Sequence, residues 1–159
     1  MRTRGVIRLA LTLGFMTVAN GALAQNSATF NARLDWVPIS GSERNDVAGS
    51  GSVTATLSRS RLSIAGCFAG LPAIATRASL HRGVATGARG PAIVEINITN
   101  SRDGTLSGDV TLDEEQRDAL LAGHLYIQLH AERGVAPDNA VLWGWLLANQ
   151  RPSPCTVAD

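Results

Sequence analysis

The sequence predicts an all-β fold, an antiparallel β-sandwich or Greek-key barrel, with one short helix near residues 113–122; of the two we favour the sandwich. Three observations lead to this fold class. Apolar and polar residues alternate with a period of two in many short segments, glycine-rich or polar turns separate these segments, and only one segment carries the signals of a helix. Many short strands in a chain of this length are typical of an antiparallel sandwich.

The alternation defines each strand in turn. In the first strand candidate, Phe30, Ala32, Leu34 and Trp36 are separated by polar residues, which predicts one buried and one exposed face. The run at 141–147 is nearly all apolar, which a strand buried on both faces or a helix would equally explain. The strand candidates are residues 30–36, 53–57, 62–68, 74–81, 92–98, 106–112, 125–130 and 141–147.

The helix is predicted from its end signals. Thr111 and Glu114 have the spacing of a capping box, and Gly123 stands where a helix commonly ends. The acidic residues 113–115 fall in the first turn, where negative charge stabilises the helix dipole. We therefore interpret them as helix-capping residues rather than as a catalytic carboxylate pair.

The first residues have the pattern of an export signal. Three arginines precede the apolar run Leu9–Val18, and the A-x-A sequence Ala22–Ala24 follows it. We expect residues 1–24 to be a cleaved signal peptide of the general secretion type, which would deliver the protein to the periplasm or out of the cell. Residues 25–150 would form a single domain, and 151–159 a C-terminal tail.

Charge and size limit the class of partner. Removing residues 1–24 takes away three arginines and no acidic residue, so the formal net charge changes from +1 to −2. A slightly acidic chain lacks the basic surface that nucleic acid binding needs. The apolar run of the signal is shorter than a bilayer span. We expect a monomer with no membrane span after cleavage, whose partner is an unidentified protein or a component of the cell envelope.

Two cysteines are present, Cys67 and Cys155. An even number of cysteines in an exported chain predicts a disulfide, and these two allow one intramolecular pairing. Closing a loop of nearly ninety residues would stabilise the fold by about 4–5 kcal/mol in the chain-entropy model. The alternative is a buried Cys67 with an unattached tail around Cys155.

Two stretches carry a resemblance to a known family. The first contains His81, Gly83 and the run Gly90–Val94, and the second contains Gly123 and His130. In this order they resemble the CHRD domain, the module named after chordin that occurs alone in many bacterial exported proteins. The resemblance implies a sandwich similar to Cu,Zn superoxide dismutase or immunoglobulin domains, and no general chemistry. Further matching residues are Val37-Pro38, Gly49-Ser50-Gly51, Leu120, Tyr126, Ile127, Leu142, Gly144 and Leu146.

The chain departs from this pattern at its polar positions. Ser79 stands where the family has the first histidine of His-x-His, and Trp145 stands where glutamine is usual. Val141 and Trp143 replace the acidic and arginine positions of the final strand. The resemblance therefore identifies a fold more securely than a polar site.

A metal centre is the first candidate chemistry. His81 and His130 could meet if their strands are neighbours, but copper or zinc would need further ligands at about 2.0–2.2 Å. His124 and His130 would be about 20 Å apart along one strand. The alternative is that both candidate histidines are partly buried and bond to backbone or to each other. Ser79 lies two residues before His81 without the nucleophile elbow of a hydrolase, so we expect no enzymatic activity.

Trp143 and Trp145 alternate onto one strand face. Such a pair could stack on a carbohydrate, anchor a partner, or fill the core of a small sandwich. The sequence therefore predicts an exported, non-enzymatic protein with a binding or structural role and no cofactor. The competing hypothesis is a copper- or zinc-binding or redox protein with a reduced site at His81 and His130.

Overall fold

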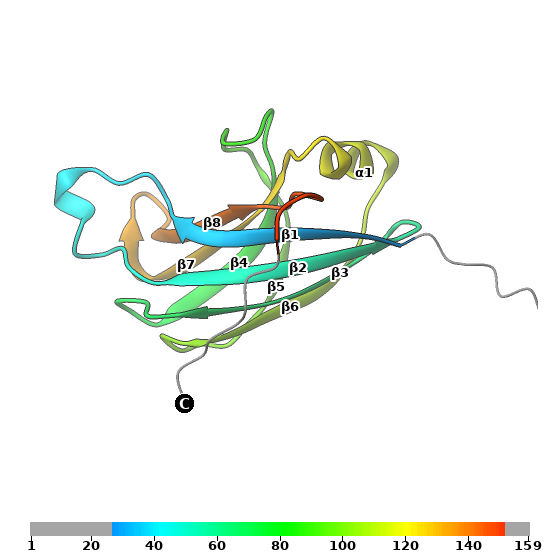
Figure 1. Cartoon of the computed structure of the whole chain (residues 1–159). Helices are drawn as coiled ribbons and strands as arrows, with labels where there is room; N and C mark the ends of the chain where they lie inside the picture. The colour runs from blue at the N-terminus through cyan, green and yellow to red at the C-terminus, as the bar shows by residue number, and fades with distance from the viewer. Residues whose placement is uncertain (1–26, 152–159) are drawn as a thin grey trace, which may run out of the picture.

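Eight antiparallel strands and one α-helix are found in residues 27–151, the part of the chain that this computed structural model describes (Figure 1). All eight predicted strands are confirmed. They are β1 (Ser27–Trp36), β2 (Ser50–Ser58), β3 (Arg61–Ala69), β4 (Ala75–Arg82), β5 (Ala92–Ile98), β6 (Gly104–Thr111), β7 (Leu125–Val135) and β8 (Ala140–Trp145), with a short 3-10 helix at Gly41–Glu43 and α1 at Glu114–Leu121. The predicted signal peptide and the tail with Cys155 lie outside the described residues.

The predicted sandwich is wrong, because the sheet closes into an eight-stranded barrel. The strand order around the barrel is β1-β2-β3-β6-β5-β4-β7-β8. Two narrow seams close it. At the first seam β5 and β6 pair only through Asn97–Ser107 and Ile98–Leu106. At the second seam two residues of β1, Asp35 and Trp36, pair with β8.

The physical reason for this correction lies in what alternation can show. A period of two tells which face of a strand is buried, and this is the same for a sandwich and a barrel. Whether the outermost strands also bond to each other depends on a few residues at the seams. Here Val37 N–H donates to the Val141 carbonyl at 3.1 Å, and a bridge joins Asn31 to Leu147. These contacts link segments more than a hundred residues apart.

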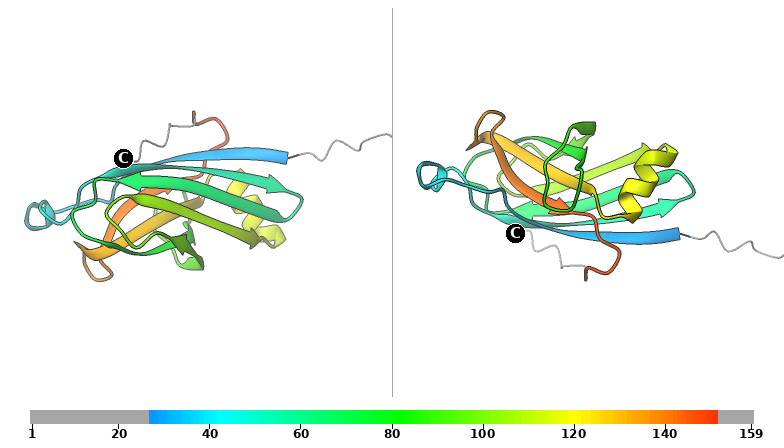
Figure 2. Two further views of the ribbon diagram at one scale, coloured as in Figure 1. Left: turned by 90° about the horizontal axis from the view of Figure 1, so that it is seen from below. Right: turned by 90° about the horizontal axis from the view of Figure 1, so that it is seen from above.

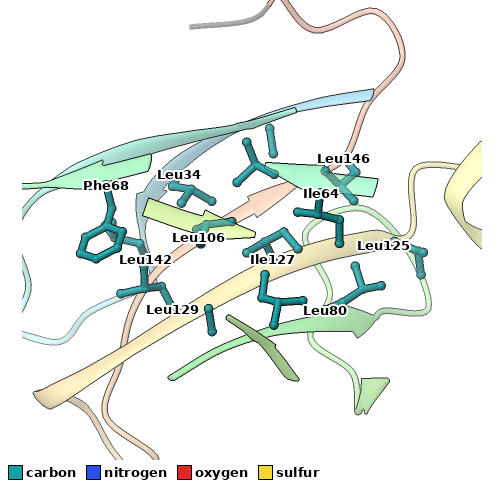
Figure 3. Packing of buried hydrophobic residues seen from close by; sticks show 14 of the residues in the cluster. Leu34, Ile64, Phe68, Leu80, Leu106, Leu125, Ile127, Leu129, Leu142 and Leu146 are labelled. Carbon is teal, nitrogen blue, oxygen red and sulfur yellow. The ribbon is translucent and has the colours of Figure 1, made fainter. Parts of the chain in front are cut away.

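Leucine and isoleucine side chains from opposite walls fill the barrel (Figure 3). Leu34, Leu80, Ile127, Leu129 and Leu142 are each 0 % exposed. Burying a side chain of this size stabilises a fold by roughly 1.5–3 kcal/mol. The interior is therefore a packed apolar core, and any polar chemistry has to lie on the outer face.

Helix α1 begins and ends at local signals. Its N-cap is Asp113, not the predicted Thr111: Asp113 accepts from Gln116 N–H at 2.7 Å and donates its own N–H to the Gln116 side chain at 3.2 Å. Gly123 follows the helix with φ +74, as its predicted role requires. Within residues 27–151, no helix has the length and hydropathy that a membrane-crossing helix requires.

The loop between β4 and β5, residues 83–91, stands out beside α1 (Figures 1 and 2). Gly83 N–H donates to the His124 carbonyl at 2.9 Å, and the Thr86 hydroxyl donates to the Gly123 carbonyl at 2.8 Å. These bonds hold the loop against the segment that follows the helix. The loop therefore has a defined position above the outer face of β4, β7 and β8.

Candidate functional site

The outer face of β4, β7 and β8 carries polar and aromatic side chains in rows across the strands. Register sets the rows, because residues that pair across antiparallel strands point to the same face. One row is Ser79, Gln128 and Trp143, and the next is His81, Tyr126 and Trp145. Ser79, His81 and the two tryptophans are separate candidates in the sequence, and the sheet brings them together on one face.

His81 fastens the β4–β5 loop to this face. Its Nδ1 lies 3.0 Å from the Gly90 carbonyl, so Nδ1 carries the proton and donates there. Nε2 is then the acceptor for the Ser79 hydroxyl at 2.9 Å. The Tyr126 hydroxyl also donates to the Gly90 carbonyl, at 3.1 Å, and accepts from the Gly90 N–H at 3.0 Å. Gly90 is thus held by both side chains.

Glycine is required at position 90. A Cβ built there would lie 1.8 Å from the Arg82 carbonyl oxygen, a distance that no side chain could relieve without moving the backbone. The family-like motif residues His81, Gly90 and Tyr126 therefore form one structural clamp. Burial lowers the pKa of His81, partly offset by its hydrogen bond to Gly90, so the clamp works with a neutral imidazole.

His130 has a similar role at the other end of β7. Its Nδ1 donates to the Asp138 carbonyl at 2.8 Å, and the Gln128 amide lies 3.2 Å from Nε2. Burial lowers the pKa of this imidazole too, with a further lowering by the Arg77 guanidinium. His130 is 2 % exposed. We interpret it as the residue that fixes the β7–β8 turn.

The two candidate metal ligands lie on neighbouring strands but at different levels. His81 pairs with Tyr126, whereas His130 pairs with Arg77, so four residues of strand separate their positions. Among residues 27–151, no group of three or more His, Cys, Asp or Glu side chains is placed to hold a metal ion. His124 precedes β7 rather than sharing its face. The Asp138 carboxylate lies 4.0 Å from the His130 Nδ1, which makes a pair and not a group of three.

Ser79 and His81 have the hydrogen bond of a nucleophile and its base, but not the access. Ser79 is 2 % exposed, and His81 is 8 % exposed. A nucleophilic hydroxyl has to reach a carbonyl carbon at about 3–3.5 Å, which a serine covered in this way cannot do. The serine instead fixes the imidazole tautomer that donates to Gly90.

Trp143 and Trp145 lie on the outer face of β8, and both are partly exposed. The Tyr126 ring packs against Trp145 at 4.4 Å between centroids. The two indoles are 6.0 Å apart and inclined at 62°, so they form the two sides of a corner. The Arg89 guanidinium carbon lies 5.6 Å from the centre of the Trp143 ring. Trp143 also packs against residues of the apolar core, so part of its indole is covered.

Beside this corner lies a groove of about 200 Å³ over the β1–β8 seam. We call it the seam groove and define it by six residues that line it: Arg33, Asp35, Trp143, Trp145, Leu147 and Gln150. The groove lies between the paired residues Asp35 and Trp143 at one end and the Asn31–Leu147 bridge at the other.

Gly144 sits at the base of the seam groove and explains how the strands come so close. A Cβ at Gly144 would lie 2.4 Å from the Arg33 carbonyl oxygen, so only glycine lets the β1 backbone pass here. Asn31 then secures the far end, because its amide donates to the Gln150 carbonyl at 3.0 Å and its oxygen accepts from Thr54. The sequence Trp-Gly-Trp thus presents two indoles around a close backbone crossing.

Arg33 and Asp35 form the polar wall, and sequence reasoning missed them as site residues. The Arg33 Nε donates to Asp35 at 3.0 Å, and the two side chains are 62 % and 60 % exposed. Alternation with Phe30, Ala32 and Leu34 places both on the outer face of β1. Only the closure of the barrel sets them beside the tryptophans.

Cys67 also points outward, because it alternates with the inward Phe68 on β3. It is nevertheless 5 % exposed, and its sulfur lies 3.8 Å from the Ser52 hydroxyl. Cys155 lies outside the described residues. The Cys67–Cys155 disulfide therefore stays a prediction.

Comparison with known proteins leads to the same family as the motif residues that meet in the clamp. Residues 31–136 match the family model described as CHRD domain. The chain belongs to the CHRD domain family. No curated protein and no solved structure matches it. Within this CHRD domain, the clamp accounts for the motif glycine at position 90, whereas the seam groove includes Trp143 and Trp145, which lie beyond the matched residues.

Proposed function

We propose that this CHRD-domain protein is exported to the periplasm or the cell exterior and acts there as a non-enzymatic binding protein. Its binding surface would be the seam groove. The observation that carries this proposal is the pair of partly exposed indoles, Trp143 and Trp145, beside the exposed Arg33–Asp35 ion pair. Aromatic and arginine side chains in one recess are typical of binding surfaces.

Export is supported by the pattern of residues 1–24, which combines a basic start, a short apolar run and an A-x-A site. The partner would be a protein or a component of the cell envelope, since the mature chain has no basic excess for nucleic acid. We propose that the protein acts as a monomer, held by the Cys67–Cys155 disulfide and without a cofactor.

The lack of enzymatic activity is supported by the state of the reactive groups. Ser79 is covered, and both histidines of the outer face are engaged with backbone carbonyls. The acidic residues of α1 serve the helix and its surroundings: Asp113 caps it, and Glu115 accepts from Arg82 at 2.7 Å. These contacts give each group a structural role.

Cosedimentation with the envelope of the producing cell tests the proposal. The mature protein would be purified from the periplasm or medium, and its mass would show whether it begins at Gln25. We expect the wild type to sediment with the envelope fraction and Trp145→Ala to remain in solution. Trp36→Ala is the matched control, because Trp36 is 50 % exposed on β1 but does not line the seam groove. Equal behaviour of all three proteins would contradict the proposal.

A further inference from the structure

We propose that the seam groove binds a pyranose sugar unit. This inference rests on the proposed function, since it names the ligand class of the same surface. A pyranose ring has faces of C–H groups and a rim of hydroxyls, each able to donate and accept a hydrogen bond. A matching site therefore needs an aromatic face and, at its edge, donors and acceptors side by side.

The aromatic part is the corner formed by Trp143 and Trp145. Because the indole planes are inclined at 62° with centroids 6.0 Å apart, a flat extended ligand cannot lie on both. A single ring can stack on one indole while the other closes its side. Tyr126 beneath Trp145 and Arg89 over Trp143 hold the two indoles in this arrangement, so little side-chain freedom would be lost on binding.

The polar part is the Arg33–Asp35 pair. Their mutual bond uses the Arg33 Nε and one carboxylate oxygen of Asp35. A guanidinium has five N–H donors and a carboxylate about four acceptor positions, so both groups keep positions that face the solvent. A donor and an acceptor next to each other match two neighbouring ring hydroxyls. Gln150 lines the same groove.

The size and closure of the groove argue against other ligands. Its volume of about 200 Å³ is below the roughly 300–1,000 Å³ of sites for drug-sized molecules. An extended peptide would pair with a free strand edge, but β1 and β8 are joined to each other at both ends of the groove. One sugar ring, alone or as a terminal unit, fits these limits.

The test uses tryptophan fluorescence in a Trp36→Phe background. The chain has three tryptophans, so in this background the emission reports Trp143 and Trp145 only. The probes are D-glucose, D-galactose, D-mannose, N-acetyl-D-glucosamine and D-glucuronate. Sorbitol is the control ligand, because it has the hydroxyls of a hexose but no ring face. We expect a saturable change with at least one pyranose, with a dissociation constant on the order of 1 mM, and none with sorbitol.

Asp35→Asn tests the polar wall without disturbing the core, since this side chain is 60 % exposed. We expect sugar binding to weaken about tenfold, because hydrogen bonds to a charged group are the stronger ones. Asp109→Asn is the matched control: Asp109 forms a similar exposed ion pair with Arg61, 3.0 Å long, away from the groove. Binding in this variant should equal that of the Trp36→Phe protein.

The outcomes separate this inference from the proposed function. If no pyranose changes the emission, if sorbitol acts as the sugars do, or if Asp35→Asn binds unchanged, the sugar site is refuted. If the protein still sediments with the envelope in a Trp145-dependent way, the binding function stands without a sugar ligand. If neither sugar response nor sedimentation is seen, both are refuted.

Discussion

Lowering the pH should destabilise this domain through its two buried histidines. Burial lowers the pKa of His81 and of His130 below the ordinary value of 6.5, and the Arg77 guanidinium lowers both further, against the opposing effect of their backbone carbonyl partners and Asp138. Below pH 6.5 the unfolded chain therefore binds protons that the folded chain does not. The stability that the two neutral histidines contribute is fully present above this range. It is lost as the pH decreases from the unfolded-state pKa towards the folded-state pKa values.

The magnitude follows from proton linkage. Each histidine that is protonated only in the unfolded chain changes the free energy of unfolding by at most about 1.4 kcal/mol per pH unit. The two together give a limiting slope of about 2.7 kcal/mol per pH unit. The lowered pKa values of Glu43, Asp109 and Glu115 also make stability fall with decreasing pH, but only as their carboxyl groups begin to be protonated in the unfolded chain, at the acid end of the range. The slope between pH 6.5 and about 5.5 therefore reports mainly the histidines.

Urea unfolding followed by far-ultraviolet circular dichroism, between about pH 5 and 7.5, measures this slope. The comparison protein is His81→Asn/His130→Asn, in which each amide can replace the Nδ1 donor to Gly90 or Asp138 but cannot titrate. We expect a much flatter dependence on pH in the double variant. Each single variant changes one histidine instead of two. It should lose about half of the dependence of the free energy of unfolding on pH. A wild type whose stability is constant or rises below pH 6.5, or a double variant that keeps the full slope, would refute the reasoning.

Three further changes test the clamp and the disulfide. Tyr126→Phe removes both hydrogen bonds to Gly90 and should lower the free energy of unfolding by about 1–3 kcal/mol. Thermal denaturation would show this as a melting temperature lower by roughly 3–5 °C per kcal/mol. An unchanged melting temperature contradicts the clamp. Gly90→Ala forces a Cβ against the Arg82 carbonyl oxygen and should destabilise by about 1–3 kcal/mol, whereas equal stability to wild type would mean that the loop adapts freely. If Cys67 and Cys155 are paired, reduction by a thiol should add the mass of two hydrogen atoms to the mature protein, and the reduced protein should unfold at a lower urea concentration. An unchanged mass rejects the pairing.

The alternation of apolar residues predicts strands such as β1 and β3, because it reflects a property of the strand itself: one face is buried and the other is not. The β8 segment has no such alternation, since Ala140, Val141 and Leu142 are all buried, and its sequence fits a helix as well as a strand. The helix was also predictable, although its N-cap is Asp113 and not Thr111. Both side chains precede the helix at plausible spacings, and the structure places the cap at the residue directly before Glu114.

The role of the histidines could be predicted only in outline. Sequence alone allowed two histidines on neighbouring strands to share a metal or to bond to backbone. Register sets how far apart they lie, since His81 stands opposite Tyr126 and His130 opposite Arg77, four residues along the strands. Register depends on pairing between strands, and no single strand carries that information.

The sequence by itself determined the local structure: which segments form strands, where the helix lies, and that Gly90, His81 and Tyr126 belong to a CHRD-like framework. Only the tertiary structure decided that the sheet closes at the β1–β8 seam. Closure sets Arg33 and Asp35 beside Trp143 and Trp145 and so creates the seam groove. The physical reason is that alternation encodes the faces of a strand, whereas the strand that lies beside it is selected by hydrogen bonds between residues far apart in the chain.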